Sequence, residues 1–250
     1  MKKILALALA VLMLVSMVAC SKDKNAGGTN LENYEQEDIV ITHITTESGS
    51  TFHFDAIDSE TVVLTKYVGP DALHDVVIPD TLNGKKLVAI GNEAFYYCSN
   101  VKSISVPATV TTIGDYAFAG CAKLEGFTLP ATVTTIGKGV FANCTALTSI
   151  TFAAGSTLKA IPSAAFFGCT ALTAIEIPAS AKLVDSLSFF GCTALVTVTA
   201  AEGVEMIGTQ AFQNCLALTT VTLPASVRSI GSMAFANCPQ LATTPTVPAN

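Results

Sequence analysis

The sequence is poor in charged residues and contains no tryptophan. Only 13% of its 250 residues are Asp, Glu, Lys or Arg, against roughly 25% in an ordinary soluble domain. The formal net charge is −6, and Lys and Arg form no cluster. Because nucleic-acid binding needs concentrated positive charge to neutralise phosphates, we expect no nucleic-acid partner. The length suffices for one large domain or two small ones, with a hydrophobic core of useful size.

Histidine is nearly absent from the chain. His43, His53 and His74 are the three histidines, and none follows residue 74. A nucleophilic hydrolase needs a base beside its nucleophile, and histidine is the usual base. A zinc site needs clustered Cys or His ligands, yet no Cys-x-x-Cys motif occurs. His53 and Asp55 could pair as a base and its orienting acid, but we interpret them as part of a solvated surface. We predict no enzymatic activity, no metal and no cofactor.

Only one long apolar run occurs, at the N-terminus. Lys2 and Lys3 precede it, it extends from 4 to 19, and no later run reaches 18 apolar residues. This order is typical of a secretory signal peptide, which we predict at residues 1–19. Its end, MVAC at 17–20, resembles the lipobox of bacterial lipoproteins. The resemblance implies a lipid on Cys20, whereas the alternative is a plain signal peptide beside a cysteine. The small and polar residues 20–30 predict a flexible tether.

The other seven cysteines recur at an almost constant interval. They occupy positions 98, 121, 144, 169, 192, 215 and 238, so the intervals are 23, 23, 25, 23, 23 and 23 residues. Phenylalanine stands three residues before each cysteine, isoleucine or valine eight before, and leucine or valine three after. Further on, apolar and polar residues alternate, as in a short strand. A fixed period of this size is typical of a solenoid.

The repeated unit, for example PATVTTIGDYAFAGC at 107–121, resembles the BspA-like type of leucine-rich repeat. The resemblance covers residues 76–250. It implies an α/β repeat solenoid, in which a right-handed coil carries a parallel β-sheet on one face and loops or short helical turns on the other. Two extra residues near 154–157 produce the 25-residue interval, and we expect them to bulge on the loop side.

Residues 31–75 predict an N-terminal cap on the solenoid. The segments 51–56 and 61–68 alternate in polarity and flank turn-forming residues at 58–60, which predicts a β-hairpin. The cap contains ten acidic residues and one lysine, whereas residues 76–250 contain eight acidic and eight basic residues. We expect the acidic cap to keep the open end of the solenoid soluble.

The repeat cysteines predict a ladder of buried free thiols. Equivalent side chains of stacked coils lie about 4.8 Å apart, and the Cβ atoms of a disulfide lie roughly 3.5–4.5 Å apart. Disulfides are the alternative in an exported protein, although the odd number of these cysteines argues against complete pairing.

Polar residues between the apolar strand positions predict an exposed sheet face rich in hydroxyl groups. The candidate ligand-binding residues are one file of this face, Ser105, Thr128, Thr151, Glu176, Thr199 and Thr222, together with Phe167 and Phe190 on a second surface. Two alternatives are structural. Threonine suits exposed strand positions through propensity alone, and Phe167 and Phe190 can pack between adjacent coils.

We expect a lipid-anchored, exported and non-catalytic binding or adhesion protein. The resemblance supplies the idea of adhesion, since BspA-like proteins resemble surface proteins that contact host matrix proteins or other cells. The expected partner is a protein or glycan, such as a host matrix protein, and the membrane is contacted through the N-terminal lipid only. We expect the bacterial envelope, at the cell surface rather than the periplasmic face. The alternative is a structural or accessory subunit of an envelope complex.

Replacing Cys20 tests the lipid anchor. Cys20→Ser removes the thiol that receives the lipid, so labelling with a radioactive fatty acid should disappear and the protein should leave the membrane fraction. Ser16→Ala, within the apolar run, should leave both unchanged. Undiminished labelling of the Cys20→Ser variant would contradict lipidation at this residue.

Overall fold

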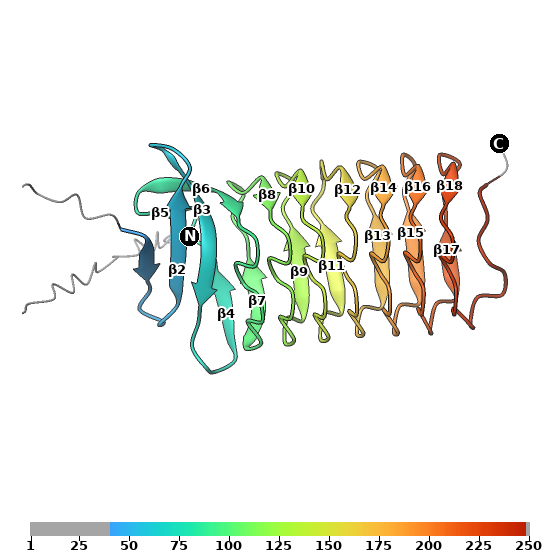
Figure 1. Ribbon diagram of the computed structural model, residues 1–250, viewed down its shortest axis with the longest axis horizontal. Coiled ribbons are helices and arrows are strands. Elements are labelled where there is room, and N and C mark those ends of the chain that lie inside the picture. The colour runs from blue at the N-terminus through green and yellow to red at the C-terminus, as the bar shows by residue number, and fades with distance from the viewer. Residues whose placement is uncertain (1–40, 249–250) are drawn as a thin grey trace, which may run out of the picture.

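The computed structural model describes residues 41–248. The predicted signal peptide, Cys20, the tether and residues 31–40 of the predicted cap lie outside this range. The described chain forms an elongated stack of coils, with a small antiparallel sheet at its N-terminal end (Figure 1). Parallel pairing between successive coils, which the repeats predict, is confirmed.

The predicted N-terminal hairpin is confirmed with the predicted boundaries. Strand β2 (Thr51–Ala56) pairs antiparallel with β3 (Thr61–Val68), and β1 (His43–Thr45) adds to the other edge of β2. The alternation of apolar residues buries Phe52, Phe54, Val62 and Leu64. Strand β3 then pairs in parallel with β6 (Lys85–Ile90), which also receives the short β5 (Thr81–Leu82). The hairpin therefore joins the first coil through continuous hydrogen bonding.

One side of the solenoid, which we call the sheet face, carries the longer strand of each coil. Its strands are β4 (His74–Val77), β7 (Val101–Ser105), β9 (Gly126–Leu129), β11 (Ser149–Phe152), β13 (Ala174–Ile177), β15 (Thr197–Ala200) and β17 (Thr220–Thr222). Their apolar residues alternate inward, and Ile175 and Val198, for example, are fully buried. The outward positions carry the predicted hydroxyl-rich file.

The opposite side differs from the expected loops or helical turns, and the α/β assignment is wrong for residues 41–248, which contain no helix. A second parallel ladder of two-residue strands lies there instead. It consists of β8 (Thr112–Ile113), β10 (Thr135–Ile136), β12 (Ala160–Ile161), β14 (Leu183–Val184), β16 (Met206–Ile207) and β18 (Ser229–Ile230). Each second residue is the apolar position eight before the cysteine. The fold is thus a β-solenoid.

Left-handed backbone at two positions in each coil explains the absence of helix. The residue directly before each cysteine and the residue five before it both have φ between +54° and +74°. A helix needs consecutive right-handed residues, and the segment between these positions is too short for one. The position before the cysteine is usually Gly or Asn, which tolerate this conformation. The other position includes Tyr116, Leu187 and Met233, which do so at a cost.

The core is a continuous column of stacked phenylalanine rings, which we call the Phe spine. It comprises Phe95, Phe118, Phe141, Phe166, Phe189, Phe212 and Phe235, whose successive ring centroids are 5.0–5.4 Å apart. The backbone N–H of one coil donates to the next coil beside the rings, as from Phe118 to the carbonyl of Val140 at 2.9 Å. Tyr67 of the cap stacks on Phe95 at 4.7 Å and extends the column into the hairpin.

Both sheets are interrupted at the 25-residue interval. The sheet face pairs from β4 to β11 and again from β13 to β17, and the second ladder likewise divides between β10 and β12. The two extra residues lie in the exposed turn between β11 and β12, as predicted, with Gly155 in a left-handed conformation. The Phe spine nevertheless continues, because Phe141 donates its N–H to the carbonyl of Ala165 at 2.8 Å. The insertion therefore separates the surface strands and leaves the core connected.

Shortening one ring of the Phe spine should destabilise the protein strongly. Phe118 is fully buried between Phe95 and Phe141, so Phe118→Ala should lower the free energy of unfolding by about 3–5 kcal/mol. Denaturant titration followed by circular dichroism measures it. The half-buried Phe167 provides a control, since Phe167→Ala should cost clearly less. Equal losses of unfolding free energy in Phe118→Ala and Phe167→Ala would contradict the Phe spine as the main source of stability.

Candidate functional site: the sheet face

The register of the sheet face places the predicted candidate residues in two aligned rows. Thr128 pairs with Thr151 on one side of the interruption. On the other side Glu176 pairs with Thr199, and Thr199 pairs with Thr222. Ser105, at the end of β7, begins the first row, beside Val77 of β4. All six candidates are exposed or partly exposed. The structure therefore brings this file together on one surface, as predicted.

The hydroxyl groups of these rows differ from those of the turn threonines. Turn threonines donate to the preceding coil, as Thr148 does to the carbonyl of Glu125 at 2.8 Å and Thr170 to that of Thr145 at 3.4 Å. In residues 41–248, the hydroxyls of the candidate rows have no such partner. The turn hydroxyls thus hold coils together, whereas those of the sheet face are free to bind water or a ligand.

Glu176 is the only charged residue among the candidates, and it stands apart from the ion pairs of the described chain. Those pairs join equivalent positions of neighbouring coils: Lys102 with Glu125 at 3.8 Å, Lys138 with Asp115 at 3.7 Å and Lys182 with Glu205 at 3.7 Å. Their side chains are largely exposed, so each pair contributes little stability. The carboxylate of Glu176 joins none of them.

A groove follows the interruption of the sheet face. It has a volume of about 500 Å³ and lies between β11 and β13, reaching Thr199 and Ala201. Its lining includes the hydroxyls of Ser149 and Thr151, the side chain of Glu176 and the apolar Phe152. Sequence reasoning identified the extra residues that separate these coils but not the groove.

The predicted aromatic pair is only partly available for contact. The rings of Phe167 and Phe190 stack in parallel, 5.1 Å apart at 3°, and both residues are half-buried. This stacking is the packing between coils that the alternative interpretation expects. Tyr96 and Tyr97 are more accessible, with 47% and 62% of their surface exposed, and their rings meet edge to face at 4.5 Å.

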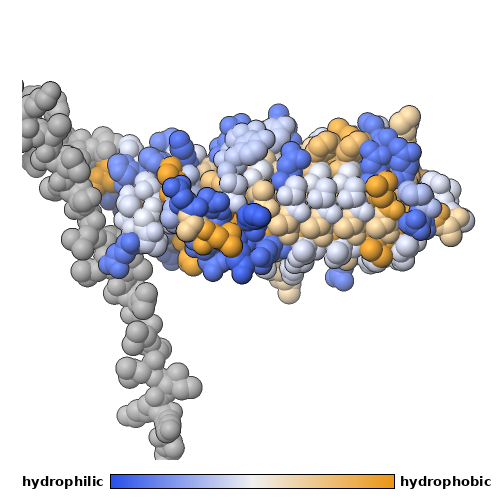
Figure 2. Space-filling view, turned by 90° about the horizontal axis from the view of Figure 1, so that it is seen from below, coloured by the Kyte–Doolittle hydropathy of each residue, from blue (hydrophilic) through white to orange (hydrophobic). Residues whose placement is uncertain are grey.

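Strongly hydrophobic side chains form no large patch on the side seen from below. Figure 2 shows pale and blue residues along most of the coils, with orange residues in small separate groups. The exposed apolar residues of the described chain include Leu73 and Val77 near the cap and Val196 and Leu216 further along. Scattered apolar residues of this kind are ordinary for a protein surface.

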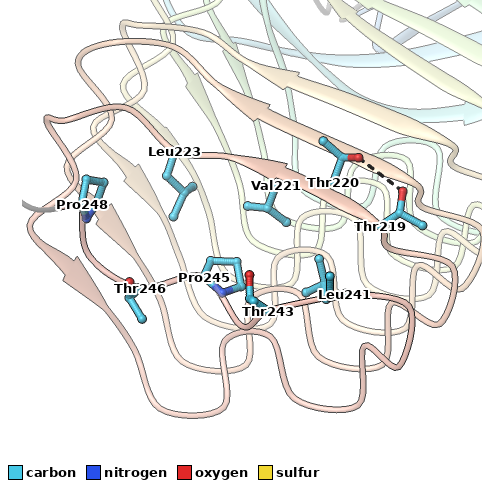
Figure 3. A pocket seen from close by; sticks show the side chains of 10 residues that line it. Thr219, Thr220, Val221, Leu223, Leu241, Thr243, Pro245, Thr246 and Pro248 are labelled. Atoms are coloured by element: carbon cyan, nitrogen blue, oxygen red, sulfur yellow. Dashed lines mark hydrogen bonds between the residues drawn. The ribbon is translucent and has the colours of Figure 1, made fainter.

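A second hollow lies at the C-terminal edge. It has a volume of about 380 Å³ and separates β17 from the last described residues. Figure 3 shows Val221 of β17 and the following Leu223 on one side, and Leu241, Pro245 and Pro248 on the other. The segment after Leu241 runs beside β17 but forms no strand, and each proline lacks the N–H needed to continue the ladder.

The cap histidines lie in two different settings. His53 lies beside His43, with ring centroids 5.3 Å apart, and partial burial together with the positive charges of His43 and Lys66 lowers the pKa of His53. His74 instead contacts the hydroxyl of Tyr67 at 2.8 Å, which in turn contacts that of Ser50 at 2.9 Å. Within the described range, no group of three or more His, Cys, Asp or Glu could hold a metal ion.

The predicted ladder of stacked thiols is present beside the Phe spine. Each cysteine from the second coil on donates its S–H to a phenylalanine carbonyl of the preceding coil, as Cys144 does to Phe118 at 3.2 Å. All seven are free thiols. Burial raises the pKa of Cys144 to about 12 and that of Cys192 to about 12. These groups stay protonated at neutral pH and are poor nucleophiles and metal ligands.

Comparison with known families agrees with this architecture. Residues 70–169 and 159–248 match the model of the BspA type leucine rich repeat region. Because the matches cover most of the chain, the protein belongs to this family. No curated protein sequence matches the chain.

Two solved structures extend the comparison. The leucine-rich repeat protein of T. pallidum, TpLRR, is 31% identical, with a TM-score of 0.71, over 76% of this chain and 87% of that one. A leucine-rich repeat protein from Eubacterium ventriosum is 27% identical, with a TM-score of 0.69, over 83% of this chain. The match spans only 52% of that second chain. Among residues 41–248, no helix is long and apolar enough to cross a membrane.

Thiol reactivity tests the buried ladder. In a Cys20→Ser variant kept free of reductant, a disulfide reagent at pH 8 should count seven thiols after denaturation. In the folded protein it should react far more slowly with the five buried thiols, those of Cys121, Cys144, Cys169, Cys192 and Cys215, because they are shielded and their raised pKa leaves little thiolate at that pH. A count of one thiol after denaturation would reveal three disulfides and contradict the ladder.

Proposed function

We propose that this protein is an exported, lipid-anchored and non-catalytic binding or adhesion protein, which recognises a protein or glycan partner through its sheet face. The observation that carries the proposal is the pair of aligned rows on that face, whose hydroxyl groups have no partner within the described chain. A regular, rigid surface with unsatisfied polar groups loses little freedom on binding. Solenoids present such extended surfaces to their partners.

The chemistry of the repeats supports a non-catalytic role. The coils after residue 74 contain no histidine, five of their seven cysteines are buried, and burial raises the pKa of Cys144 and of Cys192 to about 12. The sheet face offers hydroxyls and one carboxylate, a set suited to recognition through hydrogen bonds and charge. Membership of the BspA-type family points in the same direction.

The proposed location is the outer surface of the bacterial envelope, with a lipid on Cys20 as the membrane contact. The signal-like residues 1–19, the MVAC segment and the polar residues 20–30 support export and the lipid on Cys20. A tether of this kind lets the solenoid move away from the membrane.

A second candidate function is that of an accessory subunit in an envelope complex. The exposed Tyr96 and Tyr97 favour it, since exposed tyrosines are typical anchors of protein interfaces. An internal subunit would have to lie where external reagents cannot reach it.

Protease treatment of intact cells separates the two functions. For an adhesion protein, the repeats should disappear from intact cells, while a periplasmic and a cytosolic control protein survive. Protection of the repeats until the envelope is opened would contradict surface adhesion and favour the accessory subunit.

Binding by the purified protein completes the test. The mature chain should bind within a panel of matrix proteins and glycans, and Thr128→Lys together with Thr222→Lys should weaken that binding by introducing bulk and charge on the sheet face. The same substitutions on the turns, Thr145→Lys and Thr193→Lys, serve as the matched control. Equal binding by both double variants would contradict recognition through the sheet face.

A further inference from the structure

The groove between β11 and β13 is a local departure from an otherwise regular surface. Elsewhere on the sheet face neighbouring strands are hydrogen-bonded, but these two strands are not. Strands within a sheet lie roughly 4.8 Å apart and leave no space between them. The coil after β11 contains two residues more than its neighbours. Its strands therefore cannot stay in hydrogen-bonding register with the strands of the coils on both sides. A hollow results at this one step of the repeat.

The groove combines polar walls with apolar ends. Hydroxyls of Ser149, Thr151 and Thr199 line it, and Phe152 and Pro178 lie where the flanking strands end. Both of these apolar residues are partly exposed. A ligand that enters this groove would therefore contact apolar surface with one part and hydrogen-bond acceptors with another.

Glu176 gives the groove its charge. It projects from β13, and the other outward residues of β11, β13 and β15 are uncharged: Ser149, Thr151, Ala174, Thr197 and Thr199. Lys182 pairs with Glu205 and not with Glu176. The carboxylate of Glu176 is exposed and has no cationic partner among the described residues, so it is available to a cation brought by a ligand that enters the groove.

We propose that this groove binds the side chain of an arginine or lysine in an extended peptide segment of the partner. The cationic head group would lie at the carboxylate of Glu176 and would donate hydrogen bonds to the hydroxyl oxygens of Thr151 and Thr199. The aliphatic stem would lie against Phe152 and Pro178, since long cationic side chains bury their stems along apolar surface. The proposal rests on the proposed function and specifies the partner of the sheet face as a protein with an exposed basic segment.

Two features favour a basic peptide over a glycan. Among the described residues the carboxylate of Glu176 has no cationic partner, and the one aromatic ring in the lining of the groove, that of Phe152, is only partly exposed for stacking on a sugar. The chain also carries a net charge of −6, which steers basic partners toward it.

Titration with a short peptide tests the inference. The mature protein, labelled at its isoleucine and threonine methyl groups, is titrated with acetyl-Gly-Ser-Arg-Ser-Gly-amide and followed by NMR. Saturable shifts should appear at Ile150, Ile175, Thr151 and Thr199. The same peptide with alanine in place of arginine should cause no saturable shift. Raising the salt concentration should weaken the binding of the arginine peptide, because salt screens the ion pair.

Three variants locate the binding. Glu176→Gln keeps the size of the side chain and should weaken binding about two- to fivefold, as expected for the loss of an exposed ion pair. Deleting Ala154 and Gly155 restores a 23-residue interval and should close the groove, so that binding is lost although Glu176 remains. Glu205→Gln, which removes a carboxylate outside the groove and the sheet face, should bind like the unaltered protein. If the deletion variant does not fold, Glu176→Gln and Thr151→Val decide.

The outcomes separate this inference from the proposed function. Equal affinity for the arginine and alanine peptides, unchanged affinity of Glu176→Gln, or shifts caused by a cello- or chito-oligosaccharide alone would overturn the basic-peptide site. The sheet-face variants can still abolish matrix binding in those cases, which would leave the proposed function standing. If the peptide titration gives no arginine-dependent binding and the sheet-face variants also leave matrix binding unchanged, both the basic-peptide site and the proposed function are overturned.

Discussion

The stacking of identical side chains from one coil to the next is the constraint on which the structure depends. A single 23-residue coil cannot bury its own apolar face, so each coil becomes part of a core only when its neighbours supply the other half. The Phe spine meets this requirement with rings 5.0–5.4 Å apart, and the cysteine thiols beside it donate to the preceding coil. Tyr67 closes the column at the cap.

This constraint acts on the core more strictly than on the surface. At the 25-residue interval the two sheet ladders divide, yet Phe141 and Phe166 still stack at 5.4 Å and Asn143 still donates to the carbonyl of Phe167 at 2.7 Å. Two additional residues are therefore accommodated in an exposed turn, where loop length costs little. The groove beside Glu176 follows from this tolerance, since the surface opens where the core does not.

Much of this architecture was predictable because each coil repeats the same chemistry. The intervals between cysteines place Phe95 to Phe235 in one column, and the alternation in 51–56 and 61–68 defines the hairpin. The second ladder was missed because two residues such as Thr112 and Ile113 are too short to show a period. Left-handed backbone at Leu187 or Tyr116 has no signal in residue type. The groove depends on the spacing between coils, which no single repeat contains. The stacking of Phe167 on Phe190 agrees with the packing between adjacent coils that their repeated positions indicate.

The core is continuous along the solenoid although the surface strands are interrupted. Hydrogen–deuterium exchange on the folded protein tests this central claim most directly. Strand β13 is paired on one side only, so the amides of 174–177 should exchange faster than those of 197–199, which are paired on both sides. The turns that carry Phe141 and Phe166 should exchange slowly and at similar rates. Equal exchange in both strands, or rapid exchange of the turn at Phe166, would contradict the account.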